Sequence, residues 1–244
     1  MKVLSRDWID VDYQTLAEKF WEQGFLVIDN MFSPELMDRY QTLILDHFGA
    51  APQFSHNEEF LSKAATEVIP WFPQQDGIKE FDTLEGDDRL NELTHAILGD
   101  GWYSLYCMTM FSLKGSRGQA WHQDCAPEDP AVFNLNRLVY TGDISPEVGG
   151  QTLVVPGSHR RGLLSVGRVD EDFDDQLVLT PGKGTLVMLH GHTWHRVLPV
   201  RGACRVSTNY RCCPAGTPEA ITDICVYRNM RYRFETNEVI EERV

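Results

Sequence analysis

Apolar side chains recur at helical spacing through much of the first hundred residues. The spacing predicts helices over residues 13–23, 34–48 and 90–98, and a glycine follows each of them. Ser33-Pro34 is a start signal for the second helix. Between the first two helices, residues 25–28 form a short apolar run after a glycine, which favours a strand.

After Gly101 the pattern changes to short runs rich in β-branched and aromatic residues, separated by glycine and proline. These runs cover residues 102–113, 133–140, 152–155, 185–189 and 204–212. Many short strands without helices between them are typical of a sandwich or a barrel. We therefore expect a mainly β fold, with the N-terminal helices packed on its outside.

The length of 244 residues fits one domain. We expect a mostly helical part over residues 1–100, a β core over 101–215 and a C-terminal segment over 216–244. Residues 50–82 show no clear period, and such a segment is either a lid or binding loop, or a packed surface loop.

A net charge of -14 argues against nucleic-acid binding, because the longest basic cluster is only His159-Arg160-Arg161. The six cysteines include no CxxC pair, and the first residues lack the apolar run of a signal peptide. Adjacent Cys212 and Cys213 on a strand suit burial. These features predict a cytoplasmic protein with reduced thiols and no membrane segment. The sequence indicates no oligomeric state.

The run Trp121-His122-Gln123-Asp124 carries the first candidate chemistry. An imidazole and a carboxylate two residues apart on a strand project from one face, so both can reach one metal ion. With a distant histidine they would form the facial triad of non-haem iron(II) oxygenases. The candidates for that histidine are His190, His192 and His195, and a histidine after a strand is equally compatible with a hydrogen-bonded loop residue.

The strand over residues 204–212 alternates polar and mostly apolar positions, with Arg205, Ser207 and Asn209 on the polar face. An arginine inside a barrel is costly unless it meets an anion, and its planar guanidinium binds a carboxylate in bidentate fashion. Arg205, with Ser207 as a further donor, fits the distal carboxylate of 2-oxoglutarate. The alternative is an internal salt bridge to an acidic residue.

Over most of its length the chain resembles the phytanoyl-CoA dioxygenase family of iron(II)/2-oxoglutarate oxygenases. The resemblance rests on residues 24–29 after the first helix, Lys114 upstream of 119–124, the turn 149–151, the run 155–159, and a distal histidine followed ten residues later by Arg205. It implies a double-stranded β-helix, a jelly roll of roughly eight core strands.

The resemblance implies that iron(II), 2-oxoglutarate and O2 are used, with His122 and Asp124 as metal ligands. The interval to Arg205 selects His195 as the third ligand, and His190 is the main competitor. Lys114, Gln119 and Asn136 lie where similar proteins contact the co-substrate or substrate, although each is equally compatible with a solvated or hydrogen-bonding role. His159 is similar to a turn residue that supports the site.

We therefore expect a dioxygenase that hydroxylates a small-molecule metabolite with release of succinate and CO2. Hydroxylation is the default because halogenating relatives lack the carboxylate that Asp124 supplies. Desaturation or ring chemistry remains open on the same metal. Two other classes also remain: a cupin-like metal enzyme without 2-oxoglutarate, which would not need Arg205, and a non-catalytic binding barrel, which would not need all four site residues.

Overall fold

The computed structural model describes residues 12–52, 54, 67–126, 128–164, 171–218, 221, 224–227, 230–235 and 238–243. Its helices are α1 (Tyr13–Gln23), α2 (Pro34–Phe48), α4 (Asp82–Glu85) and α5 (Asp88–Leu98), with short 3-10 helices at Lys79–Phe81 and Ser158–Arg160. The side chains of Asp12, Ser33 and Asp87 accept backbone N–H bonds at the starts of α1, α2 and α5. Gly24 ends α1 in the left-handed conformation, with φ 80°.

The largest sheet contains six antiparallel strands in the order β1-β8-β5-β10-β3-β2. Their bounds are β1 (Phe25–Ile28), β8 (Leu186–His190), β5 (Leu135–Val139), β10 (Cys204–Cys213), β3 (Tyr103–Leu113) and β2 (Ile69–Trp71). Strands β1 and β2 come from the N-terminal part and form the two edges, so the helical part also contributes to the β core.

A second sheet has the order β4-β9-β6-β7, with β4 (Gln119–His122), β9 (His195–Val197), β6 (Thr152–Val154) and β7 (Leu177–Leu179). Its strands are also antiparallel. A third antiparallel sheet, in the order β11-β12-β13, consists of β11 (Ile224–Tyr227), β12 (Met230–Glu235) and β13 (Glu238–Arg243).

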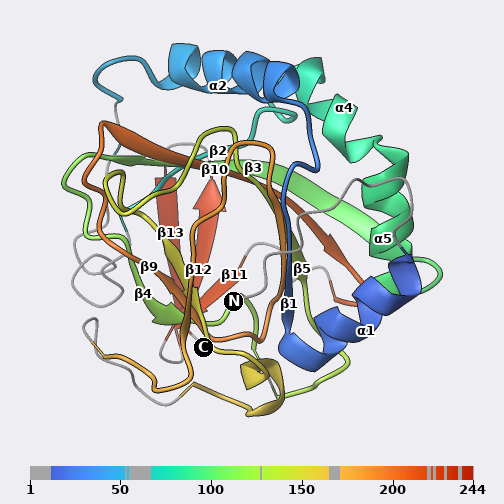
Figure 1. The fold of residues 1–244 in the computed structure, drawn as a ribbon. Coiled ribbons are helices and arrows are strands. Elements are labelled where there is room, and N and C mark those ends of the chain that lie inside the picture. The colour runs from blue at the N-terminus through green and yellow to red at the C-terminus, as the bar shows by residue number, and fades with distance from the viewer. Residues whose placement is uncertain are drawn as a thin grey trace.

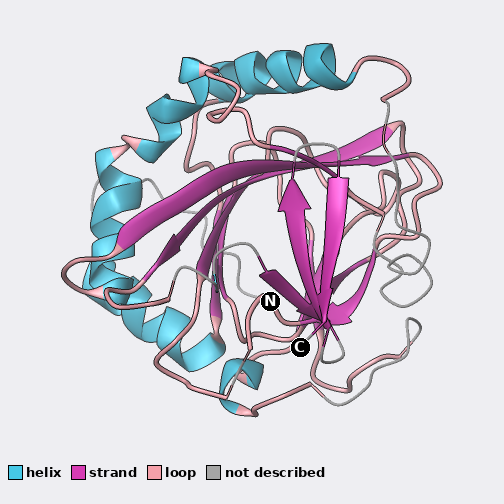
Figure 2. Ribbon diagram, turned by 180° about the vertical axis from the view of Figure 1, so that it is seen from behind, coloured by secondary structure: helices cyan, strands magenta, loops and turns pink. Residues whose placement is uncertain are grey.

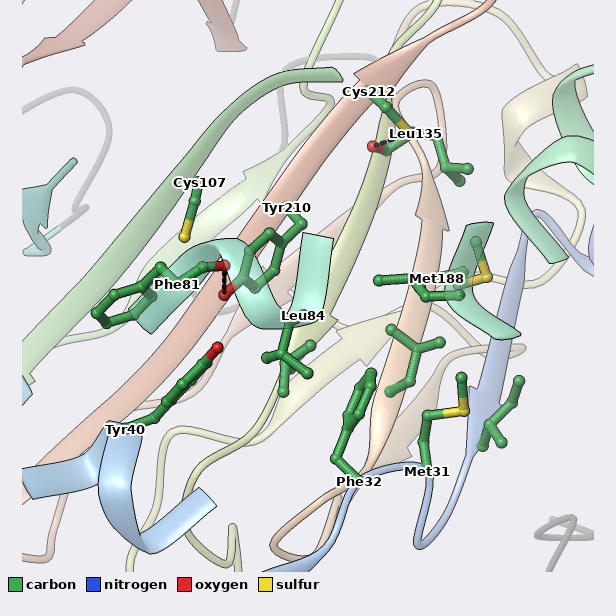
Figure 3. Packing of buried hydrophobic residues seen from close by; sticks show 14 of the residues in the cluster. Met31, Phe32, Tyr40, Phe81, Leu84, Cys107, Leu135, Met188, Tyr210 and Cys212 are labelled. Atoms are coloured by element: carbon green, nitrogen blue, oxygen red, sulfur yellow. Dashed lines mark hydrogen bonds between the residues drawn. The ribbon is translucent and has the colours of Figure 1, made fainter. Parts of the chain in front are cut away.

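The helices lie together along one side of the six-stranded sheet (Figures 1 and 2). The main hydrophobic core fills this layer and joins buried residues of α1, α2 and α5 to β3, β8 and β10. Figure 3 shows Tyr210 of β10 directed toward Phe81, whose carbonyl oxygen accepts a hydrogen bond from the Tyr210 hydroxyl at 3.1 Å. One face of the sheet is therefore committed to packing, and only the opposite face can line a site.

The three predicted helices, the strand over residues 25–28 and the five later strands are all confirmed, with boundaries within two residues. The sequence pattern missed β2, β4, β7, β9 and the strands after residue 223. The predicted irregular segment contains β2 and a 3-10 helix, and residues 53 and 55–66 of it lie outside the described part. None of the helices in the described ranges is long and apolar enough to cross a membrane.

Candidate metal centre and co-substrate pocket

A cavity lies between the two larger sheets. The six-stranded sheet lines it with Met108, Met110, Asn136, Leu138, Leu189 and the polar face of β10. The smaller sheet lines it with Gln119, His122, Thr152, His195 and Val197. Mixed apolar walls with a few convergent polar groups are typical of a small-molecule site.

Three of the predicted ligand residues, His122, Asp124 and His195, converge on one point of this cavity. Their candidate ligand atoms all lie within 4.8 Å of one another, and all three residues are buried. His122 and His195 are direct partners across the β4–β9 pair, so the sheet register itself brings the two rings together. Asp124 lies just beyond the end of β4, where its backbone N–H donates to the Gly191 carbonyl oxygen at 2.8 Å.

The protonation of both rings fits metal binding. Nδ1 of His122 lies 2.8 Å from the Ala120 carbonyl oxygen, and Nδ1 of His195 lies 2.9 Å from that of Thr193. A carbonyl can only accept, so each Nδ1 carries the proton and each Nε2 presents a lone pair. Both Nε2 atoms lie 3.6 Å from an oxygen of Asp124. The donor set therefore suits a divalent metal such as iron(II).

The charges of the site favour the ligating forms. Burial and the neighbouring His195 lower the pKa of His122 to about 4, so this ring is neutral at pH 7. Burial alone would raise the pKa of Asp124, but Arg211 and then the two histidines oppose it, and the net direction is downward. Asp124 is therefore held as a carboxylate.

His190 and His192 lie elsewhere, because alternation along β8 directs His190 to the helix side of the sheet. The His190 ring stacks on Phe133 at a centroid distance of 4.1 Å and meets Trp21 edge-on at 5.7 Å. His159 also packs there, with its Nε2 3.1 Å from the Trp21 carbonyl oxygen. The structure thus gives His159 a role in ending α1, which differs from the expected support of the metal site.

Arg205 is 3% exposed and points into the cavity. Its Nε donates to the Gly150 carbonyl oxygen at 2.7 Å, and its Nη1 donates to the Ser207 hydroxyl at 3.1 Å. Among the described residues, no carboxylate forms an ion pair with it, in contrast to the internal salt bridge considered as the alternative. Burial lowers the pKa of the guanidinium. A buried cation with neutral partners is suited to an anionic ligand.

The remaining predicted contacts divide into two groups. Gln119 and Asn136 line the cavity, and Ser207 is buried against Arg205. Lys114, in contrast, is exposed beyond the end of β3 and is not among the residues that line this cavity. Lys114 differs from the other predicted residues because the chain leaves the sheet at the end of β3, where its side chains become exposed.

Sequence reasoning missed Arg211, whose guanidinium lies 3.5 Å from a carboxylate oxygen of Asp124. The signal was available, because Arg211 continues the alternation of Arg205, Ser207 and Asn209 on β10.

Comparison with known proteins gives one family match. The family model described as phytanoyl-CoA dioxygenase (PhyH) matches residues 20–206. No curated protein matches the sequence.

Solved structures share the fold at low sequence identity. The non-heme alpha ketoglutarate dependent epimerase SnoN from nogalamycin biosynthesis has 17% identity and a TM-score of 0.68, covering 88% of this chain and 90% of its own. HygX from Streptomyces hygroscopicus, with nickel, 2-oxoglutarate and hygromycin B bound, has 17% identity and a TM-score of 0.67, covering 84% and 88%. The expected jelly-roll fold is confirmed by these matches.

Proposed function

Since the chain belongs to the phytanoyl-CoA dioxygenase family of iron(II)- and 2-oxoglutarate-dependent oxygenases, we propose that His122, Asp124 and His195 hold the iron and that the enzyme hydroxylates a small-molecule metabolite. The observation that carries this proposal is one cavity that joins three convergent ligand atoms to a buried arginine without a carboxylate partner among the described residues. A cupin-like metal enzyme would have no use for that arginine.

Different residues of the chain orient the metal ligands and bind the co-substrate. The Nδ1–H bonds of His122 and His195 fix both rings with Nε2 toward Asp124. Arg205, held by Gly150 and Ser207, binds the distal carboxylate of 2-oxoglutarate. When bound, iron(II) supplies the redox chemistry that uses O2 and converts 2-oxoglutarate to succinate and CO2.

The apolar walls of the cavity have a second role. Met110, Leu138 and Leu189 limit the access of water to the polar groups of the cavity. The bound substrate is then the molecule that lies next to the metal and is oxidised. The substrate class is a small molecule, supported by the mixed polar and apolar lining of the cavity and by the fold neighbours, whose solved complexes hold nogalamycin RO and hygromycin B. Five described cysteines are free, which supports a cytoplasmic location.

The test is an anaerobic titration of the protein with iron(II) and then with 2-oxoglutarate. We expect one iron per chain and a visible charge-transfer band when 2-oxoglutarate is added. His122→Ala, Asp124→Ala and His195→Ala should each lose tight iron binding, whereas His190→Phe, which keeps an aromatic ring beside Phe133, should retain it. Unchanged iron binding in the first three variants would remove the ligand assignment.

The outcome of oxidation is tested separately, by screening candidate small molecules for stimulated succinate formation. Mass analysis of the product distinguishes hydroxylation, which adds an oxygen atom, from desaturation, which removes two hydrogens. Epimerisation, the activity for which SnoN is named, leaves the mass unchanged. A product without added oxygen would contradict the hydroxylation proposal.

A further inference from the structure

Strand β10 places a second buried arginine at the metal centre. Arg211 is 5% exposed, lines the same cavity as Arg205, and lies with Nη2 3.5 Å from Oδ2 of Asp124. The same oxygen accepts a hydrogen bond from Nδ2 of Asn136 at 2.6 Å. Two side chains from the six-stranded sheet therefore hold one oxygen of a carboxylate that follows a strand of the other sheet.

The orientation of the Asn136 side-chain amide follows from its contact with Arg211, whose nitrogens can only donate hydrogen bonds. Nε of Arg211 donates to Oδ1 of Asn136 at 2.9 Å, and an arginine nitrogen cannot accept. Oδ1 therefore faces Arg211, and Nδ2 must face Asp124.

The orientation of the Asn209 side-chain amide follows from the same argument. The backbone N–H of Arg137 donates to Oδ1 of Asn209 at 3.2 Å, so Nδ2 of Asn209 is turned toward Oδ1 of Asn136, which it reaches at 2.7 Å. Each amide is thus set by a donor that cannot be reversed. The network gives Asp124 one orientation.

We propose that Arg211 is a positioning residue, which together with Asn136 fixes the Asp124 carboxylate for metal binding. This inference rests on the proposed function, since it concerns the same three-ligand site. Arg211 acts through Asp124 and has a role separate from that of Arg205, which belongs to the co-substrate end of the strand. Asn136 accordingly serves the metal ligand, and the co-substrate or substrate contact expected from the sequence stays a prediction.

The experiment measures Co(II) affinity in the absence of 2-oxoglutarate and substrate, so that no turnover is involved. Arg211→Met should weaken Co(II) binding about 10- to 100-fold, the usual effect of losing a partner of a metal ligand. Asn136→Leu should act in the same direction, and Arg211→Lys should restore part of the affinity because it returns the charge without the Nε donor.

Two controls separate the possible outcomes. Arg196→Met removes a buried arginine next to His195 whose guanidinium pairs with Asp172 at 2.8 Å, and it should leave Co(II) affinity unchanged. Arg205→Met should weaken 2-oxoglutarate binding but keep Co(II) affinity. Circular dichroism and thermal melting of each metal-free variant show whether it is folded, and Asn136→Leu and Arg211→Lys provide independent readings if Arg211→Met is not.

If wild type binds no Co(II), or if Asp124→Ala binds it as tightly as wild type, the proposed function itself fails. If wild type binds Co(II) through Asp124 but folded Arg211→Met and Asn136→Leu bind it equally well, the positioning role is overturned while the proposed function stands.

Discussion

Arg205 is the side chain whose charge and shape the proposed co-substrate needs most directly. It is buried and has neutral partners, so 2-oxoglutarate would supply its carboxylate. We expect Arg205→Ala to weaken 2-oxoglutarate binding by on the order of 2 to 3 kcal/mol, or roughly 30- to 150-fold. Arg205→Lys should recover only part, because an ammonium cannot reproduce the planar fork.

The measurement is an anaerobic titration of 2-oxoglutarate into iron-loaded wild type and both variants. Equal affinity in Arg205→Ala would mean that the arginine is only structural.

Gly150 supports Arg205 and has no room for a side chain. Its φ is +68°, and a Cβ there would lie 2.4 Å from Cδ of Arg205. Gly150→Ala should therefore displace the guanidinium and weaken 2-oxoglutarate binding several-fold, in addition to a backbone cost of about 1 kcal/mol.

Gly77→Ala is the matched control, since Gly77 has a φ of +81° but nothing within 4 Å of its Cβ position. It should show the backbone cost, measured by urea denaturation, with unchanged 2-oxoglutarate affinity. Similar affinity losses in both variants would contradict a specific role of Gly150.

Arg137 links two elements, the outer face of β5 and helix α5. The residue is fully buried, and its guanidinium donates to the Tyr210 carbonyl oxygen at 2.8 Å and to Asn91 and Thr94 of α5 at 3.4 Å. Arg137→Met leaves these buried acceptors without their donor, so the free energy of unfolding should fall by about 1–3 kcal/mol.

Urea denaturation measures this change. Lys79→Met removes an ion pair exposed on the surface, with 3.7 Å between Nζ and Asp82, and should shift the free energy of unfolding far less. An equal effect of both substitutions would contradict the proposed link.

Among the helices and strands, the periodicity of apolar residues was sufficient to predict the long ones. The α2 helix was predictable because Ser33-Pro34, the apolar spacing and Gly49 all agree. β9 was not predictable, because its three residues, His195–Val197, are too few to show alternation. The pairing of His122 with His195 depends on tertiary register, so the family resemblance located the distal histidine, and spacing alone left His190 open.

The whole molecule should lose stability when its buried histidines are titrated. Burial lowers the pKa of His159, His190 and His192 below the ordinary value of 6.5, and His190 is lowered furthest, well below that value. The unfolded chain therefore binds more protons than the folded chain below about pH 6.5. Their contribution to stability is complete above that pH and is lost as the pH falls toward the folded pKa values.

Urea denaturation of the metal-free protein between about pH 7.5 and pH 5 measures this loss. The free energy of unfolding should decrease toward pH 5, and His190→Phe should show a smaller decrease, because it removes the histidine with the largest described shift in this cluster. An identical pH dependence in wild type and His190→Phe would show that this cluster does not control acid stability.

The cross-strand pairing of His122 and His195 couples metal supply to the persistence of the folded state. A ligand that needs both rings binds only when β4 and β9 are paired, so by mass action it stabilises that pairing, by about 2.7 kcal/mol at one hundred times its dissociation constant. Strands of four and three residues form few bonds with each other. Metal-starved protein should therefore be the form that proteases remove first, which ties the lifetime of the enzyme to the availability of its metal.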